Sequence, residues 1–81
     1  MNQHNTNKIT DVIIHTDEQL DDQQFASLSE QVYRQQGIVS LSRNPHAPRF
    51  LMVVYNAANV KARSILETVR STGFNAKLVG I

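Results

Sequence analysis

The pattern of apolar and polar residues in the first half of the chain predicts one strand and one helix. Ile9–Thr16 is rich in β-branched apolar residues, which favours a strand buried on one face. Over about residues 22–36, apolar side chains recur at helical intervals: Phe25, Leu28 and Val32. Asp21, with Gln24 three positions later, is a variant of the capping box that begins such a helix. Gly37 is predicted to end the helix in a left-handed conformation.

The pattern after Gly37 predicts a hairpin. Residues 38–43 alternate, and this alternation predicts Val39 and Leu41 on one side of a strand. Residues 44–48, with two prolines, predict the turn. The run from Arg49 to Tyr55 is continuously apolar after Arg49 and rich in β-branched and aromatic residues; such runs belong to strands covered on both faces, so a central strand is predicted.

The last third of the chain predicts a second helix and a closing strand. Asn56 and Asn59 are candidate N-caps. The apolar positions of the helix are Val60, Ile65, Leu66 and Val69. Gly73 is predicted to stop it, and residues 74–81 to form the final strand.

This order of elements predicts a ferredoxin-like α+β fold, β-α-β-β-α-β, with a four-stranded antiparallel sheet and two helices on one face. Residues 1–8 are polar without periodicity and are predicted to form a disordered tail before a single domain over 9–81. In this topology the loop after the first strand, the hairpin turn and the segment before the last strand meet at one end of the sheet.

The second face of the sheet is expected to be apolar. If Leu51, Val53 and Tyr55 face the helices, alternation turns the residues between them outward. The predicted outward set is Phe50, Met52 and Val54, together with Ile13 and Val79 on other strands. Ordinary surface apolarity is one explanation. The other is an interface for a protein partner or for a homodimer.

Composition excludes several classes of function. Eight basic residues against seven acidic ones give a net charge of +1, which argues against a nucleic-acid partner. No apolar run resembles a signal peptide or a membrane span, so no membrane association is expected and the cytoplasm is the expected location. The chain has no cysteine and no glycine-rich phosphate loop. A catalytic cluster is equally lacking, and a non-enzymatic binding module is predicted.

Two sets of polar residues have alternative interpretations. No cofactor is expected, but His15, Asp17, Asp21 and His46 could converge at the loop end of the sheet and offer nitrogen and oxygen ligands to a transition-metal ion. Against this, Asp21 is accounted for by the capping box. Arg43 and Arg49 flank the hairpin turn, where they could be solvated, contact an acidic partner, or face the acidic loop of this domain.

Several motifs resemble the heavy-metal-associated domain family over about residues 9–79. They are Gly37-Ile38, alternate Leu51, Val53 and Tyr55 followed by Asn56, then Ile65, Val69 and Gly73-Phe74. The resemblance implies a ferredoxin-like fold and metal binding or transport. In that family a Met-x-Cys-x-x-Cys loop binds soft metal ions, and its cysteines fall here on Asp21 and Gln24. Phe74 replaces the tyrosine often found beside that loop. The chain therefore resembles a degenerate member without thiol ligands.

Overall fold

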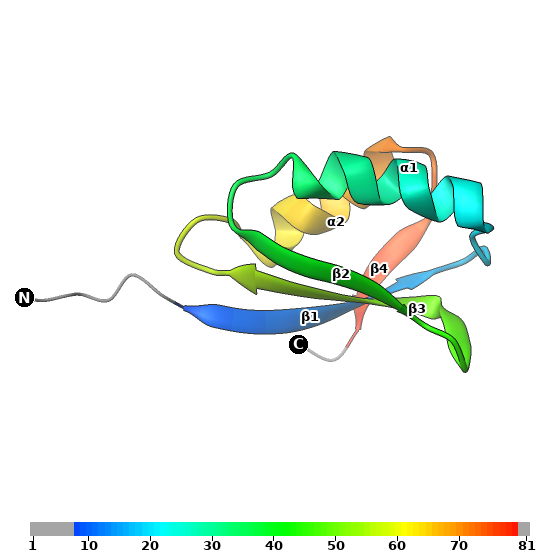
Figure 1. Ribbon diagram of the computed structural model, residues 1–81, viewed down its shortest axis with the longest axis horizontal. Helices are drawn as coiled ribbons and strands as arrows, with labels where there is room; N and C mark the ends of the chain where they lie inside the picture. The colour runs from blue at the N-terminus through cyan, green and yellow to red at the C-terminus, as the bar shows by residue number, and fades with distance from the viewer. Residues whose placement is uncertain (1–7, 80–81) are drawn as a thin grey trace, which may run out of the picture.

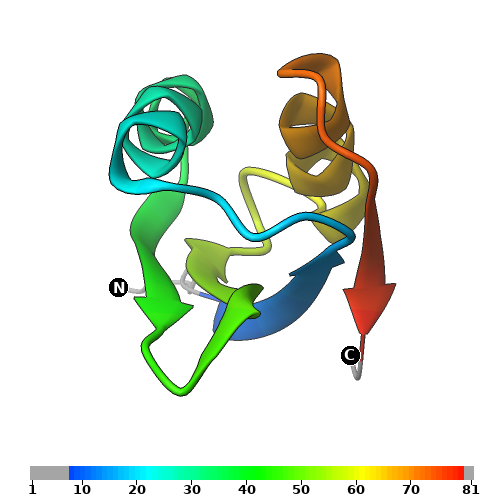
Figure 2. The same ribbon diagram turned by 90° about the vertical axis from the view of Figure 1, so that its right-hand side faces the viewer.

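Four antiparallel strands form one sheet, and two helices cover one of its faces (Figures 1 and 2). The computed structural model describes residues 8–79. Along the chain the elements are β1 (Ile9–Thr16), α1 (Asp22–Tyr33), β2 (Ile38–Asn44), β3 (Ala47–Asn56), α2 (Ala62–Ser71) and β4 (Ala76–Val79). The strand order is β2-β3-β1-β4, so β3 and β1 are central. The predicted fold class is confirmed. Apart from Lys8, the predicted tail lies outside the described residues.

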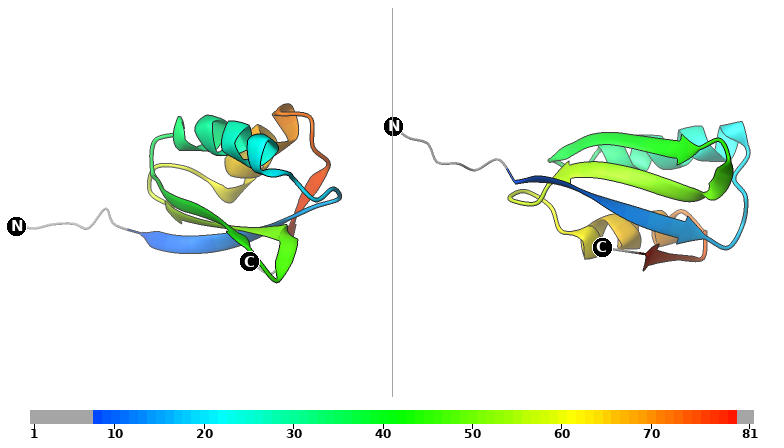
Figure 3. Two further views of the ribbon diagram at one scale, coloured as in Figure 1. Left: turned by 45° about the vertical axis from the view of Figure 1, so that its right-hand side comes forward. Right: turned by 90° about the horizontal axis from the view of Figure 1, so that it is seen from below.

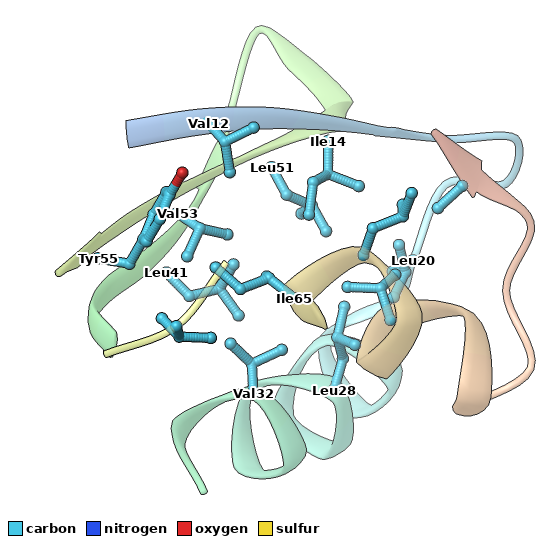
Figure 4. Close-up of a cluster of buried hydrophobic side chains, with 14 residues drawn as sticks. Val12, Ile14, Leu20, Leu28, Val32, Leu41, Leu51, Val53, Tyr55 and Ile65 are labelled. Atoms are coloured by element: carbon cyan, nitrogen blue, oxygen red, sulfur yellow. The ribbon is translucent and has the colours of Figure 1, made fainter. Parts of the chain in front are cut away.

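The core lies between the sheet and the helices (Figure 4). Ile14 on β1 and Leu51 and Val53 on β3 are fully buried, and they meet Leu28 of α1 and Ile65 of α2. These residues occupy the strand positions and helix faces that the periodicity predicts. The second face of the sheet carries no helix in the part of the chain that the structure describes, as the view from below in Figure 3 shows. β3 is therefore a central strand, as predicted, although in the described residues helices cover only one of its faces.

A β-bulge corrects the prediction for β2. Ile38 pairs with Tyr55 and Ser40 with Val54, so β2 advances two residues while β3 advances one. The extra residue, Val39, is 55% exposed, whereas Leu41 is buried. Val39 and Leu41 therefore do not share a side, because the bulge interrupts the two-residue period from which the prediction was made.

The end of α1 and the start of α2 both differ from the predictions. Helix α1 ends at Tyr33, and Gly37 adopts its positive φ of 101° in the turn that leads to β2. A Cβ at Gly37 would lie 2.8 Å from the Asn59 Cβ, so this turn requires glycine for its conformation and for its close approach. Asn56 Oδ1 accepts from the Ala58 N–H at 2.9 Å and thereby caps a turn. The N-cap of α2 is Lys61, without a side-chain bond, so the predicted asparagine caps are wrong.

The end of α2 agrees with the sequence, while the last strand begins later than predicted. Gly73 has a φ of 104° directly after the C-cap residue Thr72, as expected of a glycine stop. Phe74 precedes β4 and packs, partly buried, against the core. The predicted strand residues 80 and 81 lie outside the described residues.

The edge strands β2 and β4 each have a backbone group bound by a side chain of the helix layer. The N–H of Leu41 donates to Tyr33 Oη at 2.9 Å, and Arg70 Nε donates to the carbonyl of Ala76 at 2.9 Å. Unpaired backbone groups on an edge strand are the ones that a further strand would bind. These contacts therefore occupy a donor on one edge and an acceptor on the other.

Candidate functional site

The open face of the sheet is apolar along its central strand. Phe50 and Met52 of β3 are 39% and 38% exposed, and Val54 is partly buried, whereas the alternate residues Leu51 and Val53 lie in the core. Each residue therefore lies on the side that alternation predicts. Isolated exposed apolar residues are common on protein surfaces, so their arrangement decides whether they form a patch.

The register joins these residues into one strip across three strands. Ile13 of β1 pairs with Met52 on one side and with Val79 of β4 on the other, which places the three side chains in one row. The open-face strip is here defined as the predicted set of Ile13, Phe50, Met52, Val54 and Val79. Ile9, which is 55% exposed, lies on the same side of β1 and was not predicted, although the alternation Ile9, Asp11, Ile13 could have identified it.

His15 also lies on the open face, two residues beyond Ile13. Its ring meets that of Phe50 edge to face, with ring centroids 5.0 Å apart. Its Nδ1 is buried and has no hydrogen-bond partner among the described residues. His15 therefore lies beside the open-face strip, at the loop end of the sheet.

The twist of the sheet hollows the open face beside the hairpin. In Figure 2 the β2-β3 hairpin and β4 both bend downward on either side of β1. A groove of about 450 Å³ lies between them. Its lining combines Ile13, Met52, Phe50 and Val79 with the hairpin residues Asn44 and Pro45. The order of apolar and polar residues along one strand cannot predict this groove, because the shape of the groove depends on how the strands twist relative to one another.

Two charged residues lie at opposite ends of this face. Asp11 precedes Ile13 by two residues on β1 and pairs with Val54. Lys77 of β4 pairs with His15, at the other end of the strip. Both side chains are exposed. The open face therefore has a negative end and a positive end separated by apolar residues.

At the loop end of the sheet, the expected meeting of three segments is confirmed. The Asp17 N–H donates to the carbonyl of Asn75 at 2.9 Å, joining the loop after β1 to the segment before β4. Thr16 is fully buried, and its Oγ1 donates to the carbonyl of Glu18 at 2.6 Å and lies 3.3 Å from the carbonyl of Arg49. These bonds hold the loop against the hairpin.

Arg43 faces the acidic loop of its own domain, which was one of the three predicted alternatives. Its Nη1 donates to the carbonyl of Leu20 at 2.8 Å, and its Nη2 lies 2.7 Å from Asp22 Oδ1. The guanidinium carbon lies 4.6 Å from the centroid of the Phe25 ring, a cation–π contact. Arg49, by contrast, is exposed.

The positions that match the family's metal loop are close together but already engaged. Asp21 Oδ1 accepts from the Gln24 N–H at 2.7 Å, and Gln24 Oε1 accepts from the Asp21 N–H at 2.9 Å. The predicted capping box is therefore confirmed. Phe74 joins both residues in lining a pocket of about 310 Å³. One side-chain oxygen of each residue thus satisfies the backbone at the start of α1.

The predicted metal ligands do not converge. His15 lies on the open face, His46 at the tip of the hairpin, and Asp21 in the capping box. Within residues 8–79, no three histidine, aspartate or glutamate side chains are arranged to hold a metal ion. Alternation along β1 explains part of this result, because it turns His15 onto the open face, where its ring packs against Phe50.

Neither described helix has the length and apolarity needed to cross a membrane. Comparison of the sequence with protein families and with curated proteins finds no match.

Solved structures, by contrast, resemble the fold closely. A copper-binding domain of a P-type ATPase has a TM-score of 0.76 and 17% identity, over 86% of this chain and 93% of its own. A yeast copper transporter domain has a TM-score of 0.76 and 18% identity, covering 86% and 94% of the two chains. A putative copper-ion-binding protein from Bacillus anthracis has a TM-score of 0.77 and 11% identity, covering 88% and 99%. At these identities the similarity establishes that the chain shares the fold of these solved structures.

Proposed function

We propose that this chain is a non-enzymatic binding module, a degenerate heavy-metal-associated domain that binds protein through the open face of its sheet. The observation that supports the proposal most directly is the open-face strip, in which Ile13, Met52 and Val79 form one row beside a groove of about 450 Å³. A sheet face that met only water would alternate to polar residues at these positions. An apolar patch with a hollow centre is typical of a protein contact.

The same structure gives little support to catalysis. Among the described residues, neither His15 nor His46 has a side-chain hydrogen bond to a hydroxyl or a carboxylate. A nucleophile activated by a base, or a base held by a carboxylate, requires such a bond.

Metal binding is the second candidate, because the similar solved structures are named for copper binding. It would need imidazole and carboxylate ligands in place of thiolates, since the chain has no cysteine. The capping box occupies Asp21 and Gln24, at the positions that match the metal loop. Protein binding therefore accounts for more of the observed geometry.

Site-specific photo-crosslinking, in cells of the organism from which the sequence comes, tests the proposed function. A benzophenone amino acid replaces Phe50 on the open face and, as the control, Gln31, which is exposed on α1 in the helix layer. We expect a protein adduct from position 50 and none from position 31. The adduct should disappear when Met52→Lys is added and persist when Gln31→Lys is added. Equal adducts from both positions, or an adduct insensitive to Met52→Lys, would contradict the proposal.

A further inference from the structure

The open face has the charge pattern of a surface that binds a second copy of itself. We propose, building on the proposed function, that the partner is another molecule of this chain, docked face to face with its strands running in the opposite direction. The inference depends on the positions of Asp11 and Lys77 and on the spacing of the apolar side chains between them.

A two-fold axis that crosses the strands at the level of Ile13 and Met52 reverses the strand direction in the second copy. On β3, Phe50 and Val54 lie two residues on either side of Met52. The rotation therefore brings the large Phe50 of each copy against the smaller Val54 of the other. Met52 meets its own equivalent. The contact is isologous, the arrangement found in most homodimers.

The charges select this orientation over the other in-plane two-fold axis. With the axis across the strands, Asp11 of one copy faces the end of the second copy that carries His15 and Lys77. With the axis along the strands, Asp11 would face apolar Val54 and find no cation. A carboxylate covered without a partner is costly, whereas opposite charges across an interface fix orientation.

The edges and the area of the sheet are consistent with this arrangement. Tyr33 and Arg70 each occupy one backbone group, on β2 and β4, that a further strand could otherwise bind. Four strands about 4.8 Å apart and about seven residues long present roughly 450 Å² per copy. The total of about 900 Å² is below the range of stable complexes, so a weak dimer is expected, with a Kd between about 10 µM and 1 mM.

Charge reversal tests the proposed orientation. Sedimentation equilibrium of the full chain, from 10 µM to 1 mM (about the expected Kd range), should follow a monomer–dimer equilibrium. Asp11→Lys and Lys77→Asp should each raise the Kd by about tenfold, because each creates two like-charge contacts by symmetry. The double variant should restore the original Kd. Glu67→Lys, an equal charge change on exposed α2, is the control and should have no effect.

Cysteine crosslinking gives an independent readout, since the chain has no cysteine of its own. Met52→Cys lies beside the proposed axis, with about 10 Å between the two facing sheets, so a bis-maleimide crosslinker with a spacer of about that length should give a covalent dimer, whereas Glu67→Cys should not. Two results together would overturn the proposal that the partner is a second copy. The chain would be monomeric at about 1 mM, the weak end of the expected Kd range, and Met52→Cys would give no more covalent dimer than Glu67→Cys. Charge variants without effect overturn the antiparallel orientation.

The two proposals fail in different ways. If the chain is monomeric but position 50 still crosslinks a different protein in a Met52-dependent manner, the open face is a protein interface and only the second copy is wrong. If position 50 yields no adduct at all and the chain is monomeric, both proposals fall.

Discussion

Replacing Arg43 by methionine should destabilise the domain more than any other single change of a surface cation. Methionine keeps the unbranched stem and removes the guanidinium, so the substitution isolates the contacts of the charged head. Those contacts join β2 to two segments: the loop after β1 through Leu20, and the first turn of α1 through Asp22 and the ring of Phe25. The side chain of Arg43 is only 23% exposed, which makes these contacts partly shielded from water.

The size of the effect follows from the individual contacts. The bond to the carbonyl of Leu20 has a charged donor, and such bonds contribute about 1.5 kcal/mol or more. The contact with Phe25 adds about 0.5 kcal/mol. The ion pair adds least, because the side chain of Asp22 is 99% exposed and its charge is screened. We therefore expect a loss of about 2 kcal/mol in the free energy of unfolding, or about 10 °C in Tm for a domain of this size.

Urea unfolding followed by circular dichroism measures the loss, with Arg49→Met as the matched control. Arg49 flanks the same turn but is exposed, so its replacement should change the free energy of unfolding by less than about 0.5 kcal/mol. The reasoning is refuted if Arg43→Met and Arg49→Met give the same midpoint, because the guanidinium contacts would then contribute nothing to stability.

Three further outcomes can be measured on the same chain. Asp21→Ala removes the carboxylate that accepts from the Gln24 N–H, and it should lower the free energy of unfolding in urea by about 1 kcal/mol. Gln24→Ala, which removes the reciprocal bond, should lower it by less. Equal stability of Asp21→Ala and wild type would contradict the capping role. Gly37→Ala should lower Tm more than Gly73→Ala, since both have positive φ but only a Cβ at Gly37 meets another atom closely, the Asn59 Cβ at 2.8 Å. The reverse order in a calorimetric scan would show that the close contact is relieved at little cost. Titration calorimetry with zinc, nickel and copper should give no specific binding, because ligand side chains do not cluster among the described residues; stoichiometric binding that is lost in His15→Ala would favour the metal-binding alternative.

Much of the fold was predictable because β3 is a long apolar strand whose residues point alternately to the two faces of the sheet. Leu51, Val53 and Tyr55 lie in the core as predicted, and the glycine stop at Gly73 has the expected conformation. The errors arose where a local pattern was overruled by pairing with another strand or loop. The position of Val39 depends on a bulge that is visible only in the register with β3.

The candidate site was predictable in part for the same reason. Alternation identified the side of the sheet on which Phe50 and Met52 lie, and the register then placed Ile13 beside them. The predicted metal ligands do not cluster among the described residues, because proximity at one end of a sheet does not fix where side chains point. The position of His15 on β1 places its side chain on the open face, and the side chain of Asp21 caps the backbone of α1.

The contacts of Tyr33 and Arg70 with the sheet edges bear on how large an assembly of this chain can grow. Strand pairing at an edge is repeatable, because every added molecule exposes a new edge, and it leads toward fibres. The proposed face-to-face pairing uses the open-face strip of each molecule and stops at two. By occupying the Leu41 N–H and the Ala76 carbonyl, Tyr33 and Arg70 each remove one backbone group from the edges at which open-ended pairing would begin.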